Sequence, residues 1–210
     1  MELFHPLYDR LAVWGATDRD ILVDARGIPG DKVVVTGSPR HDAWCGDLAA
    51  VRHRQRVSLG VGATDHLVVL APSPAPANLN RRLVEAVARG AASIANAHLV
   101  IKPHPDEDVT FYQGLLDALG TERSSVIQQA DLFPLLAASD LLVTYWSTVG
   151  AEAIYLDKPV VVVDLFNTAQ PPAYVLAGAA ALVRSAEQVG PVFAELLQGA
   201  EQGRAIAEAR

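Results

Sequence analysis

The chain has 210 residues, of which half are apolar and a fifth are charged, a composition typical of a soluble globular protein with a substantial core. The net charge of −7 at neutral pH argues against nucleic-acid binding, which usually depends on a basic face. The single cysteine, Cys45, excludes a disulfide framework and a cysteine metal site, and it fits a reducing cytoplasm.

The first part of the chain is predicted to hold only one strand–helix–strand unit. Residues 1–10 include several charged side chains, so we predict no secretory signal peptide and expect a cytoplasmic protein. Strands are predicted at residues 11–14 and 32–36, with a helix at residues 17–25 between them. Because two strands are too few for an independent sheet, residues 1–38 are expected to be the trailing end of an N-terminal domain or an extension packed on the main one.

Residues 39–65 are expected to form an interdomain linker. The Gly-Ser-Pro sequence at 37–39 interrupts the strand pattern, residues 47–56 are a polar helix candidate, and residues 60–65 are rich in Gly. Arg40 follows the first of these turns. It either borders a cleft between two domains or is a solvated charge in a simple turn, and the sequence favours neither interpretation.

Residues 66–210 are predicted to form one complete α/β domain. Its strand candidates are continuously apolar and β-branched, which is typical of parallel strands buried on both faces. Parallel strands joined by helices make a doubly wound, Rossmann-like sheet, here of about six strands. The predicted strands are residues 67–71, 99–102, 125–128, 141–144, 160–163 and 181–183. The predicted helices are residues 79–96, 108–119, 132–138, 148–156 and 186–197. No apolar run reaches the ~20 residues of a membrane span.

Two loops at the carboxyl ends of these strands carry polar groups, and doubly wound sheets bind ligands at that edge. The loop at 71–74 contains Ser73 and lacks the Gly-rich dinucleotide fingerprint, so neither NAD nor FAD is expected. In the sequence 102–105, two prolines fix the backbone around His104, which could donate to a phosphate oxygen or act as an acid or base. Lys102 would add positive charge. A stiff turn with a surface histidine would look the same.

The segment 140–163 is the most informative part of the chain. An apolar strand runs into a short polar turn, and Ser147 and Thr148 then open a helix that carries Gly150 and Glu152. Free N–H groups at a helix start hold phosphate, and a glycine there allows close approach. Glu152, about one turn further along, could accept hydrogen bonds from sugar hydroxyls. The pattern predicts a nucleotide-diphosphate site, although an N-capped helix alone would also explain the two hydroxyl residues. No metal or other cofactor is expected.

Three segments resemble the C-terminal, donor-binding half of the GT-B superfamily. That superfamily includes nucleotide-sugar glycosyltransferases, UDP-N-acetylglucosamine 2-epimerases and CDP-glycerol glycerophosphotransferases. Residues 11–42 look like the end of the family's N-terminal domain and the crossing into the second domain. The sequence LVIKPHPDED at 99–108 is similar to a Lys-x-His-Pro segment of the epimerase and CDP-glycerol branches. Residues 131–164 look like the family's donor-binding signature.

The resemblance implies roles for individual residues. Ser147 and Thr148 would hold the donor diphosphate, Glu152 would bind the ribose hydroxyls, and His104 would line the cleft. The epimerases carry a Ser-Gly-Gly turn and two consecutive carboxylates, whereas this chain has Ser-Thr-Val-Gly and then Glu152 followed by Ala153. These departures favour a transferase of the surface-polysaccharide or teichoic-acid type.

The resemblance also implies partners. The substrate would be a nucleotide-activated sugar or polyol, and the acceptor domain would come from a missing N-terminal part or a partner subunit, through which peripheral membrane association is possible. Two alternatives stay open: half of a UDP-N-acetylglucosamine 2-epimerase-like enzyme, and a non-catalytic nucleotide-binding module. The sequence specifies neither the nucleobase, the sugar nor the acceptor.

Overall fold

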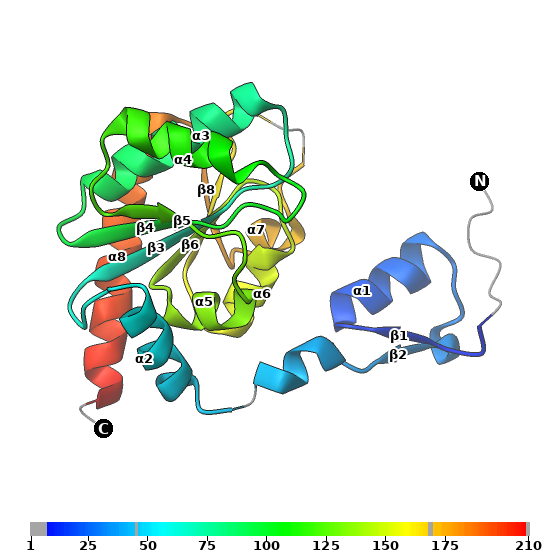
Figure 1. Cartoon of the computed structure of the whole chain (residues 1–210). Coiled ribbons are helices and arrows are strands. Elements are labelled where there is room, and N and C mark those ends of the chain that lie inside the picture. The colour runs from blue at the N-terminus through cyan, green and yellow to red at the C-terminus, as the bar shows by residue number, and fades with distance from the viewer. Residues whose placement is uncertain (1–7, 45, 168–169, 209–210) are drawn as a thin grey trace. The chain divides into compact units, whose positions relative to one another are not determined.

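The structure is a computed structural model that describes residues 8–44, 46–167 and 170–208 (Figure 1). The chain divides into two compact units, residues 1–48 and residues 49–210. This division falls within the stretch 39–65, whose role as an interdomain linker stays a prediction, and the helix at residues 48–58 begins there.

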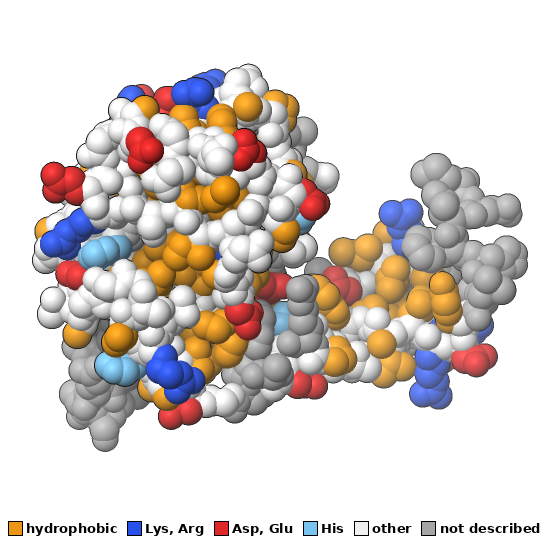
Figure 2. All heavy atoms as spheres, in the orientation of Figure 1, with side chains coloured by type: hydrophobic (Ala, Val, Ile, Leu, Met, Phe, Trp, Pro, Cys, Tyr) orange, Lys and Arg blue, Asp and Glu red, His pale blue; other side chains and the backbone are white. Residues whose placement is uncertain are grey.

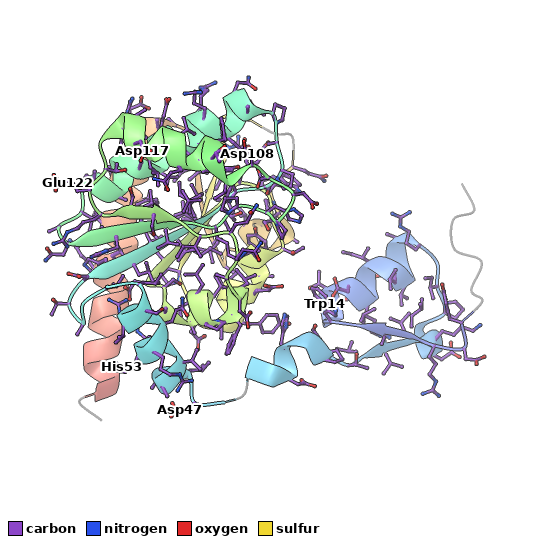
Figure 3. All side chains as sticks on the ribbon, viewed as in Figure 1. Trp14, Asp47, His53, Asp108, Asp117 and Glu122 are labelled. Carbon is purple, nitrogen blue, oxygen red and sulfur yellow. The ribbon has the colours of Figure 1, made fainter. Side chains whose placement is uncertain are left out.

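The first unit contains a two-stranded parallel sheet, as the strand–helix–strand pattern predicts. Its elements are β1 (Leu11–Val13), α1 (Ala16–Asp20), the π-helical turn η1 (Ile21–Ala25), the 3-10 turn η2 (Gly30–Lys32), β2 (Val33–Val35) and the 3-10 segment η3 (Pro39–Trp44). The single predicted helix is thus an α turn that continues as a π turn. Val13 and Val33 are buried, but Trp14, Ile21 and Val35 are about half exposed. Hydrophobic side chains cover much of this unit's visible surface (Figure 2), and Trp14 is labelled in Figure 3.

The second unit is built on a six-stranded sheet in the order β5-β4-β3-β6-β7-β8, with every neighbouring pair parallel. This confirms the predicted doubly wound, Rossmann-like fold. The strands are β3 (His66–Ala71), β4 (Ala97–Ile101), β5 (Ser124–Val126), β6 (Leu141–Thr144), β7 (Val160–Val163) and β8 (Ala181–Val183). The helices are α2 (Leu48–Ser58), α3 (Ala77–Ala92), α4 (Val109–Leu119), α5 (Leu132–Ala138), α6 (Val149–Tyr155), α7 (Ala173–Leu176) and α8 (Ala186–Glu208).

Helices cover both faces of this sheet, which explains why its strands are continuously apolar. Figure 1 shows α3 and α4 on one side of the sheet and α5 and α6 on the other. Residues 67–70 of β3 are completely buried, and so are residues 141–143 of β6. Helices α3 and α8 approach closely at Gly90 and Gly190. A Cβ on Gly90 would lie 2.6 Å from Cγ1 of Val189, so only glycine fits there without a shift.

Two arginines attach α2 to the amino edge of the sheet. Asp140, just before β6, is 2% exposed. Its carboxylate accepts from Arg52 at 2.6 Å, from Arg56 at 2.9 Å and from the amide of Leu67 at 2.9 Å. Burial alone would raise the pKa of Asp140, but the Leu67 amide and the two guanidinium groups together lower it to about 2. The polar helix at 47–56 is therefore an integral part of the second unit.

Among the described helices, none is long and apolar enough to cross a membrane. Within the same described ranges, no group of three His, Cys, Asp or Glu side chains is arranged to hold a metal ion.

Candidate functional site

The candidate site lies where the chain direction across the sheet reverses. From β3 the chain passes to β4 on one side, whereas β6 lies on the other side of β3. Open α/β sheets bind ligands at the carboxyl ends of the strands at such a switch point. The pairing of Ala71 with Thr144 brings the loops after β3 and β6 together, and the Thr144 hydroxyl donates to the Ala71 carbonyl at 2.8 Å. The hydroxyl of Ser73 donates to the carbonyl of Trp146.

The turn before α6 presents polar groups that the fold does not use. The Ser147 hydroxyl accepts from the amide of Val149 at 3.2 Å, and the Ser147 carbonyl accepts from the amide of Gly150 at 3.3 Å. Within the described ranges, the amides of Ser147 and Thr148 have no hydrogen-bond partner. Thr148 is exposed. Because α6 has only seven residues, an anion here would be held by these local amides more than by a long helix dipole.

Gly150 makes room for a tyrosine. A Cβ at this position would lie 2.5 Å from Cζ and from the hydroxyl oxygen of Tyr174, in the short helix α7. The sequence predicts that the missing side chain admits a phosphate, whereas in this structure the space is filled by that phenol ring. The Tyr174 hydroxyl donates to the Ser147 carbonyl at 2.8 Å, and burial raises the pKa of Tyr174 to about 12. Tyr174 therefore supports the turn through the Ser147 carbonyl.

Glu152 lies in α6 and is only 5% exposed. Little of the residue faces solvent, although its position one turn into the helix is the predicted one. Its role as a ligand for sugar hydroxyls stays a prediction.

The loop after β4 presents His104 to solvent. The amide of Lys102 donates to the Leu70 carbonyl at 2.8 Å, and the ammonium group of Lys102 donates to the Gln128 carbonyl at 3.2 Å. The His104 side chain is 48% exposed, and its Nδ1 accepts from the amide of Asp106 at 3.2 Å. The same Nδ1 also lies 3.4 Å from the Asp106 carboxylate, and in the tautomer whose Nδ1 accepts from the amide, the proton of a neutral His104 is on Nε2. The outward nitrogen is then a hydrogen-bond donor.

A buried polar cluster, which sequence reasoning missed, fixes this loop. The Glu107 carboxylate accepts from the amide of His104 at 2.9 Å, from the Asn80 side chain at 2.9 Å and from the Tyr112 hydroxyl at 2.6 Å. Asn80 and Tyr112 are 3% and 1% exposed. Burial and the Glu107 carboxylate raise the pKa of Tyr112, so the phenol stays protonated as a donor. The Gln128 amide closes the other side by donating to the carbonyls of His104 and Glu107.

Asn80 also connects this cluster to the loop after β3, because its side chain donates to the Ser73 carbonyl at 3.2 Å. Through Ser73 the bonds continue to the turn before α6. The structure thus links the predicted residues Ser73, His104 and Ser147 within one edge of the second unit. Arg40 lies in the first unit, and its side chain is outside the described part of the structure.

Comparisons with known proteins identify a family and a fold. The pattern of the family described as CDP-Glycerol:Poly(glycerophosphate) glycerophosphotransferase matches residues 5–165. No curated protein matches the sequence significantly.

Several solved structures share the fold. A UDP-GlcNAc 2-epimerase from Neisseria meningitidis, bound to UDP-GlcNAc, has a TM-score of 0.69 at 19% identity, over 93% of this chain and 54% of its own. The wall teichoic acid polymerase TagF, soaked with CDPG, has a TM-score of 0.60 at 15% identity, over 91% and 48%. WaaG, a glycosyltransferase of lipopolysaccharide biosynthesis, has a TM-score of 0.59 at 18% identity, over 96% and 59%. At these identities the likeness shows the fold alone, and the chain spans about half the length of each.

Proposed function

Because the chain belongs to the CDP-glycerol:poly(glycerophosphate) glycerophosphotransferase family, we propose that its second unit is the donor-binding half of a GT-B-type transferase. Membership of this family and the shared fold confirm the superfamily predicted from the sequence. The donor in this proposal is a nucleotide-activated polyol phosphate of the CDP-glycerol type, and the pathway is the synthesis of a cell-surface polymer. A cytoplasmic location is part of the same proposal.

The donor diphosphate is proposed to bind at the turn before α6. The support is local: two amides without partners in the described ranges, at Ser147 and Thr148, lie beside an exposed hydroxyl at the carboxyl edge of the sheet. Backbone N–H groups in this position are suited to anionic oxygens. Glu152 is proposed to take the ribose hydroxyls.

The proposed reaction is a phosphoryl transfer. A hydroxyl oxygen of the acceptor attacks the phosphorus next to the polyol, the bond from that phosphorus to the bridging oxygen breaks, and the nucleoside monophosphate leaves with the electron pair. The acceptor's proton passes to a base in the acceptor half. His104 is proposed to donate from Nε2 to a phosphoryl oxygen, and the amides before α6 would stabilise the negative charge that develops on the leaving group.

The observation that carries this proposal is the family match over residues 5–165, which includes both His104 and Glu152. Calorimetric titration of the chain with CDP-glycerol tests it. We expect binding that weakens about tenfold in Glu152→Gln, corresponding to the loss of a charge-assisted hydrogen bond. The matched control Glu195→Gln, on the exposed side of α8, should bind like the wild type. Undetectable binding of CDP-glycerol, or equal weakening in both variants, would count against the proposal.

A second candidate is half of a UDP-GlcNAc 2-epimerase-like enzyme. The observation in its favour is the fold shared with the Neisseria meningitidis epimerase, which has a TM-score of 0.69 over 93% of this chain. Preferential binding of UDP-GlcNAc, and release of UDP with a C2-inverted sugar once an acceptor half is present, would decide for this candidate. Nucleotide binding without turnover in the presence of that half would instead indicate a non-catalytic module.

The acceptor half is proposed to come from a longer chain or from a partner subunit. Two observations support this: the chain spans about half the length of its solved relatives, and the small first unit exposes Trp14 and Val35. Any peripheral membrane association would then come through that half. A fused or co-expressed acceptor half should reduce the exposure of Trp14, which fluorescence quenching by iodide can measure.

A further inference from the structure

A polar cavity opens at the carboxyl ends of β7 and β8. It has a volume of about 270 Å³. Three arginines from two separate segments surround it: Arg82 and Arg89 on α3, and Arg184 just after β8. The remaining lining residues are Glu85, Ala86, Leu165, Ser185, Ala186 and Glu187. None of these residues belongs to α6 or to the turn before it, so the cavity is separate from the proposed donor site.

The three arginines have no carboxylate partner in the part of the chain that the structure describes. No acidic oxygen lies within 4.0 Å of any of their guanidinium nitrogens. Instead, Cζ of Arg82 lies over the ring of Phe166, 5.1 Å from the ring centroid, a stacking contact that needs none of the N–H groups as donors. By contrast, Arg52 and Arg56 at the amino edge of the sheet both bind one buried carboxylate.

The two glutamates of the cavity do not neutralise these arginines. Glu187 is engaged at the start of α8, where its own amide and the Ser185 hydroxyl lower the pKa of its carboxyl group. Glu85 lies three residues after Arg82 and four before Arg89 on α3, a spacing that permits ion pairs on a helix, yet none forms. Three arginines and two glutamates give the lining a net charge of +1 in a chain whose net charge is −7.

We propose that this cavity is an anion-binding site that takes the phosphate group of a phosphate ester. Guanidinium groups present planar pairs of N–H donors that match phosphate oxygens, and three of them can surround one dianion. Because they stay charged at every physiological pH, the site attracts the anion without a titration step. The proposal does not rest on the donor site before α6. The ester is either a soluble polyol phosphate or the headgroup of an acidic lipid, which share this chemistry.

Titration of the whole chain with glycerol 3-phosphate, followed by amide chemical shifts, tests this site. We expect shifts at residues 184–187 and along α3, away from the turn at 147–150. In the triple variant Arg82→Gln, Arg89→Gln and Arg184→Gln, the dissociation constant should rise at least tenfold. A matched triple variant, with glutamine at the exposed positions 10, 54 and 81, makes the same change in net charge. It should stay within about twofold of the wild type.

Equal weakening in the two triple variants would overturn the proposal, because binding would then follow net charge alone. Shifts confined to residues 147–150 would overturn it too, while leaving the donor site intact. Co-sedimentation with vesicles of phosphatidylcholine and phosphatidic acid distinguishes the two sources. Loss of vesicle binding in the cavity variant alone assigns a lipid headgroup, and binding of glycerol 3-phosphate without vesicle binding assigns a soluble ester. If the triple variant does not fold, Arg184→Gln alone should still raise the dissociation constant several-fold.

Discussion

Replacement of Asp140 by asparagine is expected to destabilise the second unit by about 3 kcal/mol. The carboxylate is 2% exposed and bonded to two guanidinium groups and an amide, so solvent does not screen these interactions. Lowering the pKa from 3.8 to about 2 corresponds to about 2.5 kcal/mol of preference for the charged form in the folded state. Asparagine also leaves Arg56, which is 6% exposed, with an uncompensated buried charge.

The pH dependence follows from the direction of this shift. The pKa of Asp140 is lower in the folded state than in the unfolded state. The stabilisation by its carboxylate is therefore complete above the unfolded-state pKa of 3.8 and is lost as the pH falls through about 2. At pH 3 roughly half of it, about 1.3 kcal/mol, remains. The stability difference between the wild type and Asp140→Asn should therefore be constant from pH 7 to about pH 5 and narrow towards pH 3.

Urea unfolding monitored by circular dichroism at 222 nm measures this difference, since most helices lie in the second unit. For a unit of this size the expected loss corresponds to about 10 °C in melting temperature. Asp117→Asn is the matched control, because Asp117 lies on the exposed side of α4 (Figure 3) and should change stability little. Equal destabilisation by the two substitutions, or a difference that does not narrow between pH 5 and pH 3, would refute the assignment of Asp140 as the charged anchor of α2.

Two further substitutions test the candidate site. Glu107→Gln keeps the size of the side chain but removes the charge that holds the His104 amide, so the β4–α4 loop should loosen; we expect faster amide exchange at His104, measured by hydrogen-exchange NMR. Gly150→Ala places a Cβ 2.5 Å from the Tyr174 ring, which must move and release the Ser147 carbonyl. Loss of the hydrogen bond from Tyr174 costs about 1 kcal/mol of stability. The affinity for the donor should fall several-fold, and an unaltered affinity would show that Tyr174 does not support the turn.

The sheet was predictable because each strand carries its own signal. The strands at 141–144 and 160–163 have the predicted bounds, since uninterrupted apolar and β-branched residues are only stable with both faces covered. The strand at 125–128 is less regular in composition, and it forms at Ser124–Val126 instead, on the outer edge of the sheet. Where burial is partial, sequence pattern places an element with less accuracy.

The contacts that shape the candidate site were not predictable, because they join residues far apart in the chain. Tyr174 reaches Gly150 from a four-residue helix that begins after a proline and has no amphipathic pattern of its own. Glu107 depends on Asn80 and Tyr112, of which Asn80 lies on a different helix. Contacts between side chains that are distant in the chain leave no pattern in a single sequence. The residues that start a helix, by contrast, form a local pattern that can be recognised directly.

Helix α2 illustrates the same limit for charged residues. From the sequence, the polar helix at 47–56 is expected to lie in a linker, and buried guanidinium groups are rare without partners. The partner of Arg52 and Arg56 is one aspartate more than 80 residues later. The sequence places that carboxylate at the amino end of β6, but only the fold brings it to the two arginines of α2.

The two edges of the six-stranded sheet differ in how their charges are used. At the amino edge, Asp140 is fully paired, and Asp65 accepts from the Gly62 amide at 2.9 Å and lies 3.1 Å from Nε2 of His98. The Gly62 amide lowers the pKa of Asp65, since its hydrogen bond favours the charged carboxylate.

At the carboxyl edge, polar groups stay available instead. Within the described ranges, two amides before α6 have no hydrogen-bond partner and the arginines around the β8 cavity have no carboxylate partner, although the same chain supplies carboxylates nearby. Partners within the protein for these amides and guanidinium groups would add stability. A bound anionic ligand can supply such partners instead. Substitutions at the amino edge should therefore change stability with little effect on ligand affinity, and substitutions at the carboxyl edge should do the reverse. For the same reason, added phosphate ester should raise the melting temperature of the wild type but not that of the cavity variant.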